Sequence, residues 1–146
     1  MRYFLILAVI MAAMTTPSFA AGSYDPPPNA DDRLKKAIKH IDRERYDRAI
    51  SELRKAAKLR PNNADIQNYL GFAYRKSGKL EESGRHYTKA LELDSNHKGA
   101  LEYQGELFLM TGKPEKAQAN LARLVALCPD GCTERTDLEA AMAAAQ

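Results

Sequence analysis

The sequence predicts an all-α fold in which three helix-turn-helix units stack as a solenoid and a C-terminal capping helix closes the stack. Two observations predict it. A 34-residue period relates successive segments of the chain, and glycines mark the same turn in two of the periods. No alternating pattern typical of strands competes with this repeat.

The period is clearest when units start at Ala64 and Lys98. The frame aligns small and aromatic residues in pairs: Gly71 with Gly105, Tyr74 with Phe108, Gly78 with Gly112, Ser83 with Ala117, Tyr87 with Leu121 and Ala90 with Leu124. The preceding segment adds Ala49, Leu53 and Ala56 in the same columns. Each unit ends at an equivalent position, occupied by Pro61, Ser95 and Pro129.

This pattern resembles the tetratricopeptide repeat (TPR) family, which has L-G-x2-Y in the first helix of a unit, a small residue and an aromatic in the second, and a terminal Pro. The resemblance covers roughly residues 31–145 and is stronger in units two and three than in unit one. It implies a right-handed superhelical solenoid of three TPR units and a capping helix, with a non-enzymatic, protein-binding function.

The turn signals set the expected boundaries. We expect units at about 31–63, 64–97 and 98–131, with helices at 31–42, 46–59, 64–76, 80–93, 98–111 and 114–127. The capping helix is expected at about 133–145, where Glu139 stands in the column that holds Gly in earlier units. A capping helix has no following helix to approach, so it does not need that Gly.

The conserved spacing has physical reasons. Gly71 and Gly105 lack a Cβ and allow close helix approach, while Gly78 and Gly112 suit the left-handed turn that ends a helix. We also expect asparagines to cap the units that follow them, by accepting a backbone N–H, at Asn63 and Asn96.

Unit one departs from the strict frame. There the frame puts Lys36 and His40 in columns that should be apolar. Moving the helix by one residue places Ala37, Ile38 and Ile41 there instead, and a buried unpaired Lys is costly. We therefore expect a shifted first helix and a turn one residue shorter, of a different kind because Glu44 stands where later units have Gly.

The first twenty residues predict a signal peptide. Arg2 gives a basic start, residues 3–14 form an apolar run, and Ser18 and Ala20 place small side chains before the cleavage site. The run is shorter than the roughly 20 apolar residues that span a bilayer. We expect cleavage after Ala20, a Pro-rich linker over residues 21–30, and a mature protein in the periplasm.

Two cysteines, Cys128 and Cys132, flank a Pro-Asp-Gly turn. In an oxidising compartment this spacing favours a disulfide that ties the third unit to the capping helix. The alternative is a thiol-redox or metal-handling function, for example with copper. That alternative lacks a C-x-x-C motif and a nearby His.

No residue set indicates catalysis, a metal site or a cofactor. His40, His86 and His97 are widely spaced, and phosphate-binding glycine loops and nucleophile motifs are missing from the sequence. The basic residues do not alternate with aromatics as in nucleic-acid binding proteins. We therefore expect a protein partner, whose identity the sequence leaves open, and no nucleic acid.

The family resemblance implies where that partner binds, because positions 2, 5, 9 and 12 of each first helix line the concave face in TPR proteins. With the shifted frame for unit one, the predicted groove comprises Lys35, Lys39, Asp65, Asn68, Phe72, Arg75, Glu102, Glu106 and Leu109. Phe72 is its one large aromatic anchor, although packing between units is the alternative role. The hypothesis is an envelope adaptor that holds a segment of another protein.

TPR domains that bind the acidic tails of chaperones use five polar groove residues. In this sequence Tyr69, Gly99 and Tyr103 stand where Asn, Lys and Arg would be, which argues against that ligand. Charge adds another possibility. Residues 33–60 hold eleven Lys or Arg and four Asp or Glu, so this basic first unit could contact an acidic partner or an anionic lipid surface. Self-association through the convex face is a third hypothesis, and the oligomeric state is open.

Overall fold

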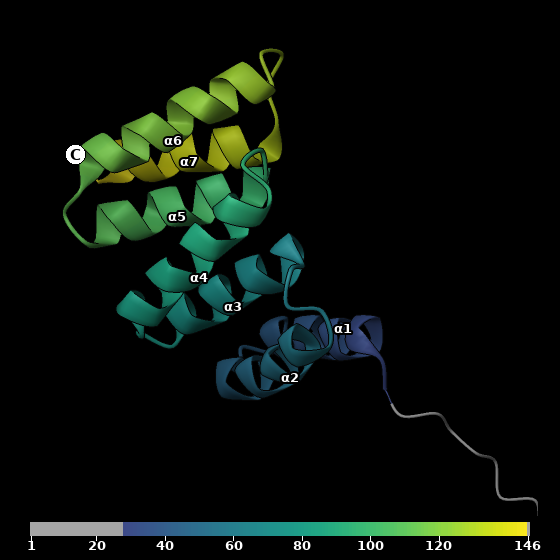
Figure 1. Ribbon diagram of the computed structural model, residues 1–146. Helices are drawn as coiled ribbons and strands as arrows, with labels where there is room; N and C mark the ends of the chain where they lie inside the picture. The colour runs from purple at the N-terminus through teal and green to yellow at the C-terminus, as the bar shows by residue number, and fades with distance from the viewer. Residues whose placement is uncertain (1–27, 146) are drawn as a thin grey trace, which may run out of the picture.

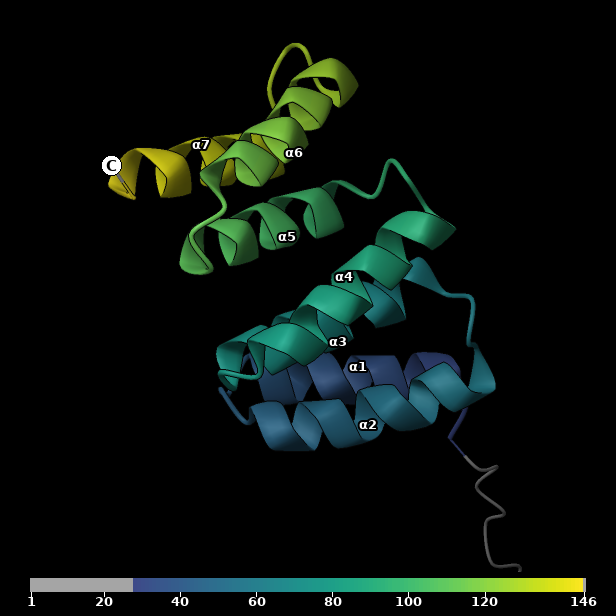
Figure 2. The same ribbon diagram turned by 60° about the vertical axis from the view of Figure 1, so that its left-hand side comes forward.

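The computed structural model describes residues 28–145, and all regular secondary structure in that range is helical. The helices are α1 (Ala30–Ile41), α2 (Tyr46–Leu59), α3 (Ala64–Lys76), α4 (Leu80–Leu93), α5 (Lys98–Met110), α6 (Pro114–Leu127) and α7 (Thr133–Ala144). They stack in chain order from α1 and α2 at one end to α6 and α7 at the other (Figures 1 and 2). The expected signal peptide and most of the expected linker lie outside the described residues.

The predicted all-α solenoid is confirmed, and every helix boundary agrees with its prediction to within one residue. The first helix begins at Ala30, one residue early, because Asn29 caps it. The Asn29 side chain accepts hydrogen bonds from the backbone N–H of Asp31 (2.9 Å) and Asp32 (3.1 Å). The Asp32 carboxylate accepts one in return from the backbone of Asn29. This reciprocal capping box ends the linker before residue 30.

Apolar side chains join neighbouring units into a continuous core. Between the first two units, Leu53, Ile66 and Leu70 are almost fully buried. Near the C-terminal end, Leu101, Leu124 and Leu138 form a second cluster drawn from three different helices. Leu138 belongs to α7, which packs against α5 and α6, so the predicted capping helix covers the last unit.

The two glycines of the close-approach column contact different partners. A Cβ on Gly71 would lie 2.5 Å from the ring of Tyr87, and Ser83 donates a hydrogen bond to the Gly71 carbonyl (2.8 Å). A Cβ on Gly105 would instead lie 2.7 Å from Leu138 of α7. The absence of a side chain at these two positions therefore allows the Tyr87 ring to pack against Gly71 and the capping helix to pack against Gly105.

The shifted frame predicted for unit one is wrong, because the strict 34-residue period continues through its turn. Glu44 has φ 54°, close to the 76° of Gly78 and the 67° of Gly112, which occupy the equivalent positions. The same backbone hydrogen bond closes each turn, from Arg45 to His40 (2.8 Å) in the first. The turn is neither shorter nor different in kind, and Glu44 adopts a left-handed conformation that normally favours Gly.

The strict frame also explains the residues that suggested a shift. Ala37 lies in the column of Gly71 and Gly105 and is fully buried there. Lys36 lies in the column of Leu70 but is not buried, since no described unit precedes α1 to cover it; its side chain is 62% exposed. A column that is apolar in the middle of a stack can be charged at its end.

One predicted cap is confirmed and one is wrong. Asn63 accepts a hydrogen bond from the backbone N–H of Ile66 (2.9 Å). Asn96 does not cap α5, because His97 takes that role: its Nδ1 accepts from the backbone N–H of Ala100 (3.1 Å). His97 stands 34 residues after Asn63. Its Nε2 also lies 3.0 Å from the Asp65 carboxylate, which connects the starts of α5 and α3.

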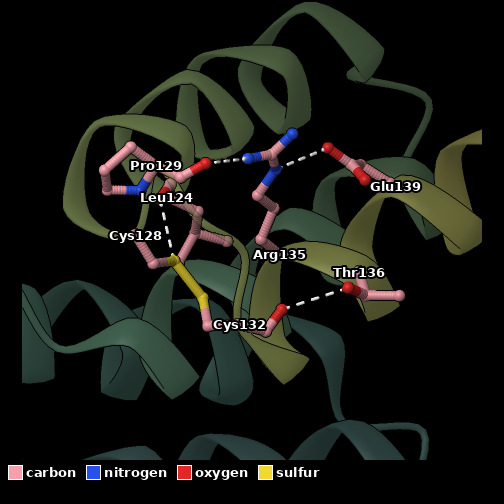
Figure 3. Close-up of a disulfide and its surroundings, with 7 residues drawn as sticks. All are labelled: Leu124, Cys128, Pro129, Cys132, Arg135, Thr136 and Glu139. Carbon is pink, nitrogen blue, oxygen red and sulfur yellow. Dashed lines mark hydrogen bonds and ion pairs between the residues drawn. A yellow bond between two sulfur atoms is a disulfide. The ribbon is translucent and has the colours of Figure 1, made fainter.

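The start of α7 is tied to the end of α6. Cys128 and Cys132 lie at disulfide distance, with an S–S separation of 2.09 Å (Figure 3). Around them, Arg135 donates to the Pro129 carbonyl (3.2 Å) and to Glu139 (2.8 Å). These contacts hold the capping helix at the point where the last unit ends.

Within the described residues, no helix has the length and apolar character needed to cross a membrane.

Candidate functional site

The first helices of the three units, α1, α3 and α5, lie side by side, and α7 follows next to α5. We call this the inner-helix face. At its centre the rings of Phe72 (α3) and Tyr103 (α5) meet at a centroid distance of 5.0 Å and an interplanar angle of 55°. Both side chains are half-buried, so they combine structural contact with accessible aromatic surface. Tyr103 was not among the predicted groove residues.

Arg75 lies beneath this aromatic pair and is largely buried. Its guanidinium carbon lies 5.5 Å from the Phe72 ring centre and 5.6 Å from that of Tyr103. Arg75 also forms a 2.5 Å ion pair with Glu106 and donates to the Tyr87 hydroxyl (3.4 Å). Its Nε and Nη1 are thus engaged within the protein, and its position indicates a brace that orients the aromatic pair.

Two other predicted groove residues lie deeper than their columns suggested. Asn68 is only 5% exposed, and its Oδ1 has no hydrogen-bond partner. It lies beside Gly99, where an added Cβ would be 3.3 Å from Asn68 Nδ2. Leu109 packs against the C-terminal core cluster and is partly buried. Both residues contribute to packing between neighbouring helices.

The two lysines of unit one are exposed, and neither forms an ion pair within the described residues. In the strict frame Lys35 shares the column of Tyr69 and Tyr103, which belongs to the inner-helix face. Lys39 shares the column of Ala73 and Leu107, which are buried in later units. The structure therefore places Lys35, but not Lys39, in the row of Tyr103, whereas the unit-one residue equivalent to Phe72 is Ile38.

The C-terminal end of the inner-helix face is acidic. Glu102 is 5% exposed and forms no hydrogen bond or ion pair within the described residues. Burial, followed by the nearby carboxylates of Glu106, Asp137 and Glu134, raises the pKa of Glu102 to about 8. Sequence columns identified Glu102 and Glu106. They could not identify Glu134 and Asp137, because these residues lie on the capping helix and reach Glu102 only through the fold.

Two further regions lie away from this face. A cavity of about 560 Å³ opens between the start of α1 and the end of α2, lined by Arg33, Lys55, Lys58 and Leu59 among others. The cysteine pair lies between the end of α6 and the start of α7 (Figure 3). In the part of the chain that the structure describes, no group of three or more His, Cys, Asp or Glu is arranged to hold a metal ion. Whether the cysteines handle electrons or copper stays a prediction, which free-thiol titration tests.

Family comparison agrees with this architecture. A TPR repeat model matches residues 39–78, and a tetratricopeptide repeat model matches residues 64–97. The chain is a TPR protein. The matched residues run from the end of α1 to His97, the residue that caps α5, and include the turn at Glu44. No match was found among the curated proteins.

Solved structures share the fold of this TPR protein at low sequence identity. The first TPR domain of Spaghetti (RPAP3), bound to the HSP90 peptide SRMEEVD, aligns with a TM-score of 0.71 and 21% identity, covering 84% of this chain and 98% of that one. The Arabidopsis OM64 TPR domain gives 0.71 and 16%, with 79% and 94% covered. The Yersinia enterocolitica type III secretion translocator chaperone SycD gives 0.71 and 15%, with 79% and 88% covered.

Proposed function

We propose that this TPR protein is a non-enzymatic interaction module of the bacterial envelope, which binds a segment of a partner protein on its inner-helix face. The observation that carries the proposal is the Phe72–Tyr103 pair, half-buried and braced by Arg75. Aromatic residues held in a fixed geometry lose little conformational entropy on binding, which makes them effective anchors.

The structural neighbours support a peptide-binding function. Both TPR domains of Spaghetti (RPAP3) were solved with the HSP90 peptide SRMEEVD, and SycD is named as a translocator chaperone. The present chain differs at the inner-helix face, where Tyr69, Gly99 and Tyr103 replace the polar residues that hold acidic chaperone tails. We therefore propose a different peptide, recognised mainly by aromatic and acidic side chains.

Site-specific photocrosslinking in intact host cells tests the binding surface. A benzoylphenylalanine at Phe72 should give a discrete adduct with a partner protein. The same group at Gln118, an exposed position on α6, serves as the matched control. Phe72→Ala should lower recovery of that partner with unchanged helicity. Equal adducts at the two positions, or none at Phe72, would count against this surface.

The envelope location is part of the proposal and has its own test. Osmotic-shock fractionation should release the protein with periplasmic markers. N-terminal sequencing of the released protein should begin at Ala21, since the predicted cleavage follows Ala20. Recovery in the cytosolic fraction with Met1 retained would contradict the location without affecting the fold.

A further inference from the structure

Among the acidic residues that the structure describes, Glu102 stands out because it is buried and forms no ion pair with a described residue. It lies on α5 at the position equivalent to Asn68 on α3, so the two side chains start from the same row of the inner-helix face. Among the groups that shift its pKa, the one cation is Arg75, which is already paired with Glu106. The carboxylate oxygens of Glu102 are not among the fully buried unpaired atoms, so an incoming cation can reach them.

The carboxylates around Glu102 come from its own helix, α5, and from α7. Glu134 and Asp137 belong to α7, which the contacts of Cys132, Arg135 and Leu138 fix against α5 and α6. Together with Glu106, they place four carboxylates against a single guanidinium group. The local charge is negative and largely uncompensated within the described residues, which favours a cationic ligand.

A second, independent observation comes from Asn68. This side chain is 95% buried, and its Oδ1 accepts no hydrogen bond. Its Nδ2 would lie 3.3 Å from a Cβ on Gly99, which stands one turn before Glu102 on α5. A buried amide oxygen without a donor marks a place where a hydrogen-bond donor is missing. The unpaired acceptor and the unpaired carboxylate thus lie in equivalent positions of adjacent helices.

We propose that Glu102, supported by Glu106, Glu134 and Asp137, receives a lysine or arginine side chain of the partner segment that binds the inner-helix face. The inference rests on the proposed function and specifies its ligand. The aliphatic part of the incoming side chain lies near the Phe72–Tyr103 pair, and its N–H groups reach Glu102. A metal ion is a poor alternative, because no group of three or more His, Cys, Asp or Glu in the described residues is arranged to hold one.

Ionisation of Glu102 provides a measurable effect besides binding affinity. The groups that face Glu102 are Arg75 on α3, Tyr103 and Glu106 on α5, and Glu134 and Asp137 on α7. In the free protein the raised pKa of Glu102, about 8, keeps it mostly protonated at pH 7. A cation binds the ionised form, so binding at pH 7 releases a proton.

The test uses the mature protein and two fluorescein-labelled peptides of glycine and leucine. One carries a central arginine and the other carries citrulline, its neutral isostere. Fluorescence anisotropy should show that the arginine peptide binds about tenfold more tightly. Its affinity should rise by up to about tenfold per pH unit between pH 6 and 8.

Matched variants assign the effect to Glu102. Glu102→Gln should remove the arginine preference and the pH dependence. Glu115→Gln removes the same charge from an exposed position on α6 and should change neither. Equal affinity of the two peptides, no binding of the arginine peptide at millimolar concentration, or an unaltered Glu102→Gln variant would each overturn the inference. Crosslinking at Phe72 judges the proposed function separately, because it does not depend on the partner's charge.

Discussion

Two buried glutamates, one in the first unit and one in the third, have opposite environments. Glu52 is 7% exposed and meets three cations: Arg33 (3.1 Å), Lys36 (3.6 Å) and Lys55 (2.8 Å). The hydrogen bond from Lys55 is the main reason that the pKa of Glu52 is lowered. Glu102 is similarly buried but faces carboxylates, and its pKa is raised. The first acid is neutralised within its own unit, whereas the second is left for a partner.

The first and second units also differ in how their helices pack. In the close-approach column, unit one has Ala37 opposite a second helix that carries Leu53, and unit two has Gly71 opposite Tyr87. Glycine with tyrosine in unit two and alanine with leucine in unit one fill similar volumes. The repeat therefore conserves volume across a helix pair and not the identity of each residue.

The largest effect is expected from Gly71→Ala, which breaks this complementarity. Its Cβ would lie 2.5 Å from the rigid Tyr87 ring, so the helices must separate, and we expect a loss of about 3 kcal/mol in unfolding free energy. The control is Gly84→Ala, whose Cβ would make an ordinary 3.5 Å contact with Leu107 and should be neutral or slightly stabilising. Urea unfolding measures both, and equal stability of the two variants would show that the column tolerates a Cβ.

Removing the charge of Glu52 should have the next largest effect. Glu52→Gln leaves Arg33, Lys36 and Lys55 without their shared acid, at a cost of about 2 kcal/mol at pH 7. The folded-state pKa is lowered, so this stabilisation is present above the unfolded pKa of about 4.5 and is lost as the pH falls through the folded value. The exposed Lys89–Glu92 pair supplies the control, since Glu92→Gln should cost well under 1 kcal/mol. Similar losses in the two variants would contradict a special role for Glu52.

Glu102 should show the opposite pH dependence. Its folded-state pKa is raised, so its contribution is complete below the unfolded pKa and is lost as the pH rises through about 8. We expect the wild-type protein to lose roughly 1 kcal/mol between pH 7 and 9, and Glu102→Gln to lose less. Denaturant titrations across this range measure the difference. Parallel curves for the two proteins would mean that Glu102 is already ionised at pH 7.

The smallest expected effect concerns the turn of unit one. Glu44→Gly places Gly at φ 54° and should stabilise the protein by about 0.5 kcal/mol, because a left-handed conformation is unfavourable for a residue with a Cβ. The reverse change, Gly78→Glu, adds a side chain where no atom lies within 4 Å, so only the backbone is affected and a loss of about 1 kcal/mol is expected. Thermal unfolding distinguishes them, and a change of the same sign in both variants would argue against the shared turn geometry.

The sequence predicted the fold closely because the 34-residue period, the turn glycines and the terminal prolines all indicate the same helices. It misjudged unit one because Lys36 was interpreted as a residue of a stack interior. At an end of the stack that column is open to solvent, and a Lys there is not buried. Strict use of the period would have given the turn at Glu44 and the cap at His97.

The candidate site could be predicted only in part. Phe72, Glu102 and Glu106 follow from their columns, but the engagement of Arg75 depends on Tyr87 and Glu106, which lie on two other helices. The environment of Glu102 depends on Glu134 and Asp137, more than thirty residues later in the chain. Such electrostatic relationships arise from packing, and no local pattern records them.

The exposed lysines of α1 have a consequence for how the protein behaves at high concentration. Solenoids can lengthen when the open end of one copy covers the open end of another, much as unpaired edge strands join sheets. Here Lys35, Lys36 and Lys39 occupy the helix that a second copy would have to cover. Joining the first units of two copies would bring like charges together as water is excluded from the interface. The lysines of α1 thus disfavour pairing of two copies through their first units.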